Sequence, residues 1–271
     1  MFSLAQNTMI LPVDIQASMA ASLPLFMLAF VLGACLGSFA QATALRLNRD
    51  EDPVRQPSRC RSCSRPLNWR QNIPLLGWLM TWGKCRHCGA AFSINYMLVE
   101  LAMGLLVGGI AVFFAWPIAL ILTIGMLLMV ICALTDLDAM LLHLPVMGLL
   151  GLVGFAASFL PFWPLSPLAS LLGMVSVVIL ITVINGLYTL LRGEAGFGSG
   201  DYWLMGAVGL WLGPVLAVIL FFLASLLGAV IGIVLMMQKK GDGQTALPFG
   251  VFISLVFICW PILNILVILR L

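Results

Sequence analysis

Long unbroken runs of apolar residues recur along the chain, separated by short polar segments. A helix needs about 20 consecutive apolar residues to cross the hydrocarbon core of a bilayer. The runs do not alternate between apolar and polar positions, as the strands of a membrane barrel would. We therefore predict an all-α, polytopic membrane helical bundle. It has about eight transmembrane helices, at residues 24–45, 97–115, 118–135, 144–160, 168–190, 202–214, 215–237 and 248–269.

The composition supports this assignment. Hydrophobic residues make up 62% of the 271-residue chain and charged residues only 8%, whereas soluble domains carry roughly 25% charged residues. The sixth run is short and is bounded by glycine and proline. The lipid bilayer is thus an expected partner. The net charge of +3 reflects membrane topology rather than nucleic-acid binding, so no nucleic-acid partner is expected.

The positive charges predict the orientation. Of the 13 Lys and Arg residues, all but Arg270 lie in the segments that follow spans one, five and seven. Cytoplasmic loops are enriched in Lys and Arg, so these segments are expected inside and both termini outside. The chain then divides into an external N-terminus with the first helix (1–45), a cytoplasmic loop (46–96) and a seven-helix core (97–271).

Four of the seven cysteines form two Cys-x-x-Cys pairs in the cytoplasmic loop, whereas the other three lie in apolar spans. Two such pairs supply the four thiolates of a closed, structural zinc site. Disulfides would need an oxidising compartment, which the topology argues against. A thioredoxin-like redox motif would need a βαβ unit. The pattern favours a zinc-ribbon-like loop over both, with the ligands Cys60, Cys63, Cys85 and Cys88.

Three carboxylates lie where apolar spans meet the same predicted cytoplasmic surface. Asp136 and Asp138 end the third span, and Asp201 begins the sixth. Carboxylates at a helix–membrane boundary are costly to desolvate and tend to mark functional sites. Glu100, just inside the second span, is expected to pair with an arginine of the cytoplasmic loop.

A pair of adjacent carboxylates predicts aspartic-protease chemistry. Both cannot ionise easily, so one holds a proton while the other deprotonates a water. Gly198 and Gly200, just before Asp201, would permit a positive φ and the close approach of an extended peptide. The alternatives for these residues are solvated helix caps and a flexible turn.

Five sequence motifs, in the same order, resemble those of the type IV prepilin leader peptidases. Residues 198–201 read Gly-Ser-Gly-Asp, similar to the Gly-x-Gly-Asp motif of that family, and residues 136–142 resemble its first aspartate motif. The two cysteine pairs flank Asn-Ile-Pro-Leu at 72–75. Gly-Ser-Phe at 37–39 and Leu-Pro-Phe-Gly at 247–250 also match.

The resemblance implies that Asp136 and Asp201 are the catalytic pair. It further implies removal of a basic leader from prepilins or pseudopilins, at the cytoplasmic side of the bacterial inner membrane. S-adenosylmethionine-dependent N-methylation of the exposed residue and association with pilus or type II secretion machinery are implied as well. The sequence contains no nucleotide-binding βαβ pattern, and it identifies no residues that bind S-adenosylmethionine.

The chain departs from the family pattern at several positions. His143 and Leu144 stand where Pro-Asp is usual, Trp203 replaces a common lysine, and Val251 replaces a proline. None of these changes removes a proposed catalytic carboxylate. Two rival functions remain at this point: a non-catalytic zinc-loop assembly factor of a pilus or secretion system, and a proton-coupled transporter.

Overall fold

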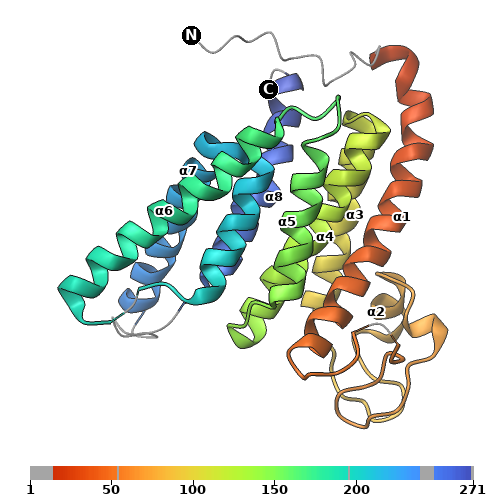
Figure 1. Ribbon diagram of the computed structural model, residues 1–271. Helices are drawn as coiled ribbons and strands as arrows, with labels where there is room; N and C mark the ends of the chain where they lie inside the picture. The colour runs from red at the N-terminus through yellow and green to blue at the C-terminus, as the bar shows by residue number, and fades with distance from the viewer. Residues whose placement is uncertain (1–14, 54, 195, 239–246, 270–271) are drawn as a thin grey trace. The chain divides into compact units, whose positions relative to one another are not determined.

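The computed structural model describes residues 15–53, 55–194, 196–238 and 247–269 (Figure 1). Lys239, Lys240 and Arg270, which enter the orientation argument, and residues 1–14 of the predicted external N-terminal segment lie outside these ranges. The elements are α1 (Ile15–Leu47), η2 (Trp69–Gln71), α2 (Leu76–Thr81), α3 (Asn95–Phe113), α4 (Trp116–Ala139), α5 (Leu144–Ala157), α6 (Pro167–Arg192), α7 (Ser199–Met237) and α8 (Phe249–Leu269). The prediction of an all-α membrane protein is confirmed.

Five of the described helices are long and apolar enough to cross a membrane, and α5 and α8 are shorter apolar helices. The chain is thus a multi-pass membrane protein. The predicted spans 202–214 and 215–237 together form α7, so the count of eight stays a prediction. A straight helix of its 39 residues would be about 58 Å long, roughly twice the thickness of a bilayer core.

Helix α7 is broken at Gly213, where φ is 72° and ψ is −178°. Only glycine adopts this left-handed conformation without strain, and Pro214 cannot supply a backbone N–H to continue the helical hydrogen bonds. Figure 1 shows α7 as two helical arms that run in different directions. The Gly-Pro boundary in the sequence therefore marks a break between two helical arms.

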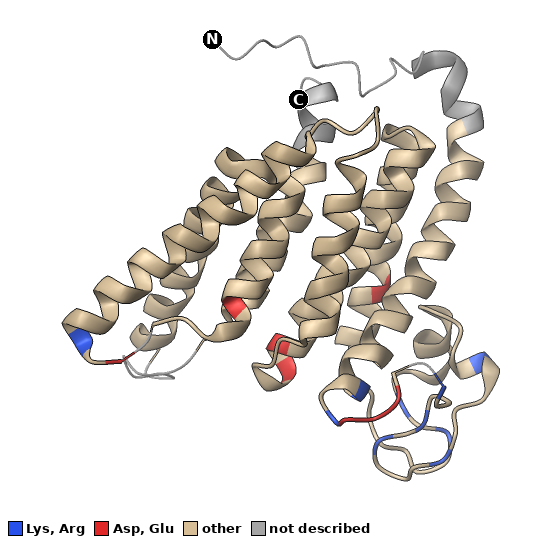
Figure 2. Cartoon of the chain, in the orientation of Figure 1, with Lys and Arg blue, Asp and Glu red and all other residues tan. Residues whose placement is uncertain are grey.

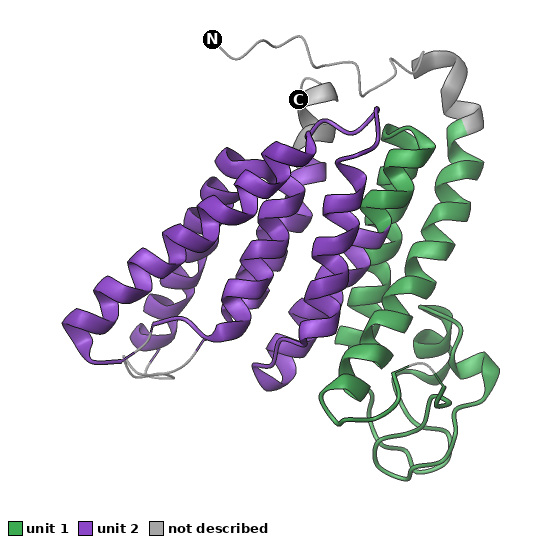
Figure 3. Ribbon diagram, viewed as in Figure 1, with its two compact units in different colours: residues 1–123 green, residues 124–271 purple. Residues whose placement is uncertain are grey.

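The chain divides into two compact units, residues 1–123 and 124–271 (Figure 3). Unit 1 contains α1, the cysteine loop (residues 48–94), α2 and α3, and unit 2 contains α5 to α8. Helix α4 begins in unit 1 and ends in unit 2. The division by topology into residues 1–45, 46–96 and 97–271 stays a prediction.

Small residues let the two long helices of unit 1 pack closely. A Cβ at Gly33 of α1 would lie 2.5 Å from the Met103 carbonyl oxygen of α3. In the other direction, Gly104 and Gly108 of α3 receive the rings of Phe30 and Phe26. Glycines four residues apart on each helix thus form the close contact that small residues provide between membrane helices.

Unit 2 uses the same device around α7. A Cβ at Gly173 of α6 would overlap the Gly209 carbonyl oxygen, and the Ser170 hydroxyl donates to the Leu210 carbonyl at 2.6 Å. Trp211 packs edge-on against Trp163 and Phe257, and its indole N–H donates to the Leu150 carbonyl at 2.7 Å. These contacts fix the N-terminal arm of α7, which carries Asp201.

Candidate active site and metal centre

Asp136 lies in the last turn of α4, and its side chain is 5% exposed. Its Oδ2 accepts a hydrogen bond from the Val251 N–H at 3.1 Å, and the Gly250 N–H also donates to this carboxylate. Both donors belong to the first turn of α8. The first N–H groups of a helix have no partner within it and carry a partial positive charge. Asp136 therefore caps α8 from a different helix.

Asp201 occupies a comparable position at the start of α7. Its Oδ2 accepts a hydrogen bond from the Gly198 N–H at 3.0 Å, and the Asp201 N–H donates back to the Gly198 carbonyl at 3.1 Å. The carboxylate is partly buried and interacts electrostatically with Asp136. Figure 2 shows acidic positions at helix ends of unit 2. The structure thus places the two predicted carboxylates at two helix N-termini of one unit.

Leu142 connects these two helix starts. A Cβ at Gly200 would lie 3.0 Å from the Leu142 Cβ, and one at Gly250 would lie 3.2 Å from its Cδ2 and 2.9 Å from Asp136 Oδ2. Any larger residue at either glycine would therefore push on Leu142 or on the carboxylate. The end of α4 and the starts of α7 and α8 converge on this leucine.

The expectation that Gly198 and Gly200 adopt a positive φ is wrong. Gly198 has φ −75°, and Gly200 lies within α7 and is absent from the described glycines with positive φ. The physical need at Gly200 is space for Leu142 rather than an unusual backbone conformation. Asp138, the third predicted carboxylate, is exposed.

Asn185 was missed by the sequence analysis and holds the segment before Asp201. Its Oδ1 accepts from the N–H groups of Gly196 and Phe197 at 2.7 and 3.2 Å, and its Nδ2 donates to the Tyr202 hydroxyl at 3.0 Å. An amide in the apolar helix α6 was a usable signal, because polar side chains inside membrane helices usually have a specific partner. Asn185 thereby fixes the approach to α7.

Aromatic contacts join the two segments that donate hydrogen bonds to Asp136 and Asp201. The ring of Phe197, in the segment before α7, lies 5.3 Å from that of Phe249, the first residue of α8, and 5.8 Å from that of Phe221. Phe249 directly precedes the Gly250 and Val251 donors. Packed rings thus connect the segment before α7 with the first residue of α8.

The cysteine pairs form two turns with the same hydrogen-bond pattern. In the first, the Cys60 N–H donates to the Arg65 carbonyl and the Ser64 N–H to the Cys60 carbonyl, both at 2.9 Å. In the second, the Cys85 N–H donates to the Ala90 carbonyl at 2.8 Å and the Gly89 N–H to the Cys85 carbonyl at 2.9 Å. Ser64 and Gly89 both have positive φ, 57° and 70°. The two halves of the site are therefore built alike.

The four thiols form a cluster that could hold a metal ion. Their sulfur atoms all lie within 4.8 Å of one another, and those of Cys60 and Cys88 are 3.8 Å apart. A tetrahedral zinc with bonds of about 2.3 Å separates its sulfur ligands by about 3.8 Å. The seven cysteines form no disulfide. His87 lies outside the cluster, and its Nδ1 is 3.3 Å from a guanidinium nitrogen of Arg65.

The thiols differ in how readily they ionise. Hydrogen bonds from the N–H groups of Cys63 and Ser62, with smaller help from neighbouring thiols, outweigh desolvation and lower the pKa of Cys60 to about 6. At Cys88 the Ala90 N–H acts in the same direction. There, desolvation and the hydrogen bonds with the other thiols dominate and raise the pKa to about 11.

Two parts of the chain match models of known protein families. Residues 31–114 match the Bacterial Peptidase A24 N-terminal domain, and residues 123–233 match the Type IV leader peptidase family. The chain belongs to the type IV leader peptidase family. The resemblance predicted from the motifs is therefore confirmed, and so is the prediction that the protein is an enzyme.

Several curated relatives of this leader peptidase share the name prepilin leader peptidase/N-methyltransferase. The Myxococcus xanthus protein is 35% identical over 226 residues, which cover 81% of this chain and 66% of the relative. The Aeromonas hydrophila protein is 31% identical over 260 residues, which cover 85% of this chain and 88% of the relative. The Stutzerimonas stutzeri protein is 34% identical over 206 residues, which cover 73% of this chain and 68% of the relative. No solved structure matches the chain.

Proposed function

We propose that this protein removes the basic leader from prepilins or pseudopilins and then N-methylates the newly exposed residue. The observation that carries the proposal is the pair Asp136 and Asp201, held at the N-termini of α8 and α7 on either side of Leu142. The relatives' printed name supports the same chemistry. Asp136 and Asp201 are the proposed catalytic residues, and Gly198 and Gly200 are proposed to line the approach of the substrate.

The mechanism follows from two carboxylates that share one proton. The ionised partner accepts a proton from a water molecule, whose oxygen attacks the scissile carbonyl carbon. The protonated partner donates a hydrogen bond to the carbonyl oxygen. As the C–N bond breaks, a proton passes from the pair to the leaving amine nitrogen. The backbone N–H donors from Val251, Gly250 and Gly198 hold the carboxylates in place throughout.

An apolar cavity in unit 2 supports the proposal of a membrane-embedded substrate. The cavity has a volume of about 700 Å³ and is lined by α5, α6 and α7. Its lining includes Ser199, Tyr202 and Trp203, which are close to Asp201 in the sequence. Glycines at 148, 151 and 206 belong to its walls. We place the apolar segment of the substrate here, with its leader in the cytoplasm. Small residues permit the close approach of a second helix.

The cysteine cluster is proposed to hold structural zinc through Cys60, Cys63, Cys85 and Cys88. The sulfur spacing fits a tetrahedral ion, and four protein ligands leave no open position for catalysis. The metal would fix the two cysteine turns relative to each other. S-adenosylmethionine is the proposed second cofactor, and it would supply an electrophilic methyl group to the amine that cleavage exposes.

We further propose that the protein lies in the bacterial inner membrane with both termini in the periplasm and the active site facing the cytoplasm. The basic residues concentrated in the cysteine loop support this orientation (Figure 2), because cytoplasmic segments are enriched in Lys and Arg. Its partners are then the prepilin or pseudopilin substrates, the bilayer, and the pilus or type II secretion machinery that uses the products.

The function is tested with purified protein, a prepilin and S-adenosylmethionine in detergent, read as the mass of the product. The wild type is expected to remove the leader and add one methyl group. Asp201→Asn keeps the shape of the side chain but cannot ionise, so cleavage should fall by about 10³-fold or more. Asp138→Asn removes an exposed carboxylate of the same motif and should cleave at nearly the wild-type rate.

Each alternative has its own outcome. Leader loss without methylation would show that the protein is a peptidase without methyltransferase activity. A folded, metal-loaded wild type that cleaves none of several prepilins would favour the non-catalytic assembly factor. Equal loss of activity in the Asp138 and Asp201 variants would contradict the assignment of the catalytic pair.

A further inference from the structure

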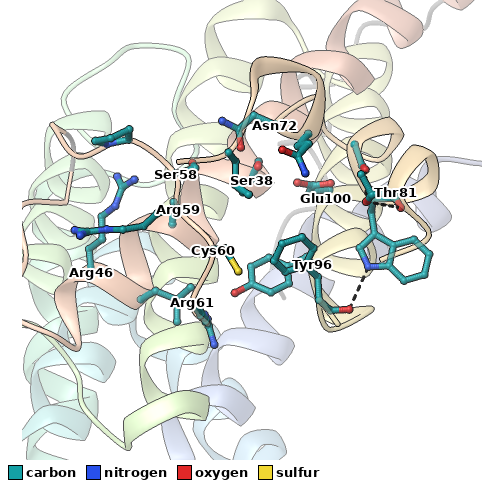
Figure 4. Close-up of a pocket in the computed structure, with 18 of the residues that line it drawn as sticks. Ser38, Arg46, Ser58, Arg59, Cys60, Arg61, Asn72, Thr81, Tyr96 and Glu100 are labelled. Atoms are coloured by element: carbon teal, nitrogen blue, oxygen red, sulfur yellow. Dashed lines mark hydrogen bonds between the residues drawn. The ribbon is translucent and has the colours of Figure 1, made fainter. Parts of the chain in front are cut away.

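Unit 1 contains a cavity of about 300 Å³ that the proposed peptidase chemistry does not use (Figure 4). It is lined by the C-terminal part of α1, the cysteine loop, α2 and the start of α3. Its volume is at the lower end of the range of small-molecule sites. Charged, amide and aromatic side chains all line it.

Glu100 of α3 is the acidic wall of this cavity. Its side chain is 8% exposed, and its Oε2 accepts from the Leu75 N–H at 2.7 Å, with a further hydrogen bond from Ser38. The expected ion pair with a loop arginine is not formed: no described residue makes a salt bridge with Glu100. A buried carboxylate without a cation is costly, so a positively charged ligand would be stabilised here.

Gln71 provides a second, independent sign of a missing partner. It lines the cavity, and its Nε2 is buried without any hydrogen-bond partner. The Asn68 N–H donates to its Oε1 at 3.1 Å, which fixes the orientation of the amide. Buried amide donors are almost always satisfied in native proteins. A ligand that presents an acceptor atom to Gln71 would satisfy this group.

The remaining walls are basic and aromatic. Figure 4 shows Arg46 and Arg59 on a different side of the cavity from Glu100. The guanidinium of Arg61 lies 5.5 Å from the centre of the Tyr96 ring, and the rings of Trp78 and Phe92 also line the space. The cavity therefore offers partners for an anion, a cation and a flat ring system together.

We propose that this cavity binds S-adenosylmethionine, with Glu100 as partner of its positive charge and Gln71 as a donor to one of its acceptors. The arginines match its carboxylate and the aromatic rings match its adenine. A nucleotide phosphate would supply the anion and the base but no cation for Glu100. This inference rests on the proposed methyl transfer and deepens it, since it gives that activity a site in unit 1.

The test is direct binding, measured calorimetrically with the zinc-loaded full chain in detergent. S-adenosylmethionine carries a sulfonium cation, whereas S-adenosylhomocysteine has a neutral thioether in its place. Glu100→Gln should raise the Kd for S-adenosylmethionine at least 10-fold and that for S-adenosylhomocysteine less than 3-fold. Gln71→Leu should raise both Kd values by a similar factor. Zinc content and circular dichroism confirm that each variant is folded.

Asp52→Asn is the matched control, because Asp52 is an exposed carboxylate of the same loop that does not line the cavity. It should change either Kd less than 3-fold. If the wild type methylates the product but the Glu100 variant has an unchanged Kd for S-adenosylmethionine, the cavity assignment is wrong, while the methyl-transfer function stands. Normal cleavage with neither methylation nor binding would overturn the methyl-transfer function, and with it this site.

Discussion

The cysteine loop of unit 1 and the helices of unit 2 are held together in different ways. In its described residues, the cysteine loop of unit 1 contains no regular sheet and only short helices, and it is organised by two backbone turns with four clustered thiols. Unit 2 consists of helices in close contact through glycines and a central tryptophan. We therefore expect the loop, which buries little apolar surface, to depend on the proposed metal, whereas the packed helices of unit 2 should not.

The largest difference between the cysteine loop and unit 2 is expected when the proposed metal is removed. Cys85→Ser, or a chelator, should abolish zinc binding and raise the rate of proteolysis within residues 46–96 by more than 10-fold. The helices of unit 2 should keep their circular dichroism signal, because they contribute no ligand to the cluster. Cleavage sites are identified by mass spectrometry.

Cys35→Ser is the control for that experiment, because Cys35 lies in α1 outside the cluster. It should keep its zinc and its resistance to proteolysis. A Cys85→Ser variant that retains zinc would refute the metal centre. Equal loss of structure in both units would refute the contrast between them.

The next largest effect is expected from crowding the helix contact of unit 2. In Gly173→Ala the new methyl group would overlap the Gly209 carbonyl and lie 2.6 Å from the Gly213 Cα. Overpacking of this kind costs about 1–3 kcal/mol. The thermal midpoint in detergent should therefore fall by roughly 3–10 °C, with zinc content unchanged.

Gly186→Ala gives the matched comparison on the same helix, since a Cβ there meets nothing within 4 Å. It should leave the midpoint unchanged or raise it slightly, because alanine favours helix more than glycine. Similar midpoints for the two variants would show that close packing at Gly173 does not stabilise unit 2.

The sequence predicted what depends on composition and on local motifs. The apolar runs correspond to the helices, the cysteine spacing to the thiol cluster, and the Gly-Ser-Gly-Asp motif to the start of α7. It did not predict that Asp136 caps α8, because the Val251 and Gly250 donors are backbone groups that carry no residue signature. Nor did it show that Glu100 lacks an arginine partner, since pairing across a loop depends on the folded path of that loop.

A smaller effect is expected at Asn185, which orients the segment before Asp201. Asn185→Ala removes the acceptor for two backbone N–H groups. Losing hydrogen bonds of about 1 kcal/mol each should lower kcat for leader cleavage about 10-fold, with a smaller change in KM. Tyr202→Phe removes only the other contact of Asn185 and should lower kcat less than 3-fold. Equal kcat values for these two variants would contradict the positioning role.

The smallest effect on kcat is expected from the backbone N–H of Val251, which donates from α8 to the proposed catalytic Asp136. Val251→Pro deletes the donor to Asp136 Oδ2, and proline is tolerated in the first turn of a helix. One lost hydrogen bond to a charged group is worth roughly 1.5–3 kcal/mol at most, and the Gly250 donor remains. We expect kcat to fall about 3- to 10-fold, with KM and the thermal midpoint nearly unchanged.

Val251→Ala shortens the same side chain but keeps the N–H, so its kcat should stay close to that of the wild type. The pair of variants separates the backbone donor from the side chain at one position. If the alanine variant loses as much activity as the proline variant, packing of Val251 matters rather than its hydrogen bond. If neither loses activity, Gly250 alone is sufficient to hold Asp136, and the active site of unit 2 tolerates the loss of one polar contact.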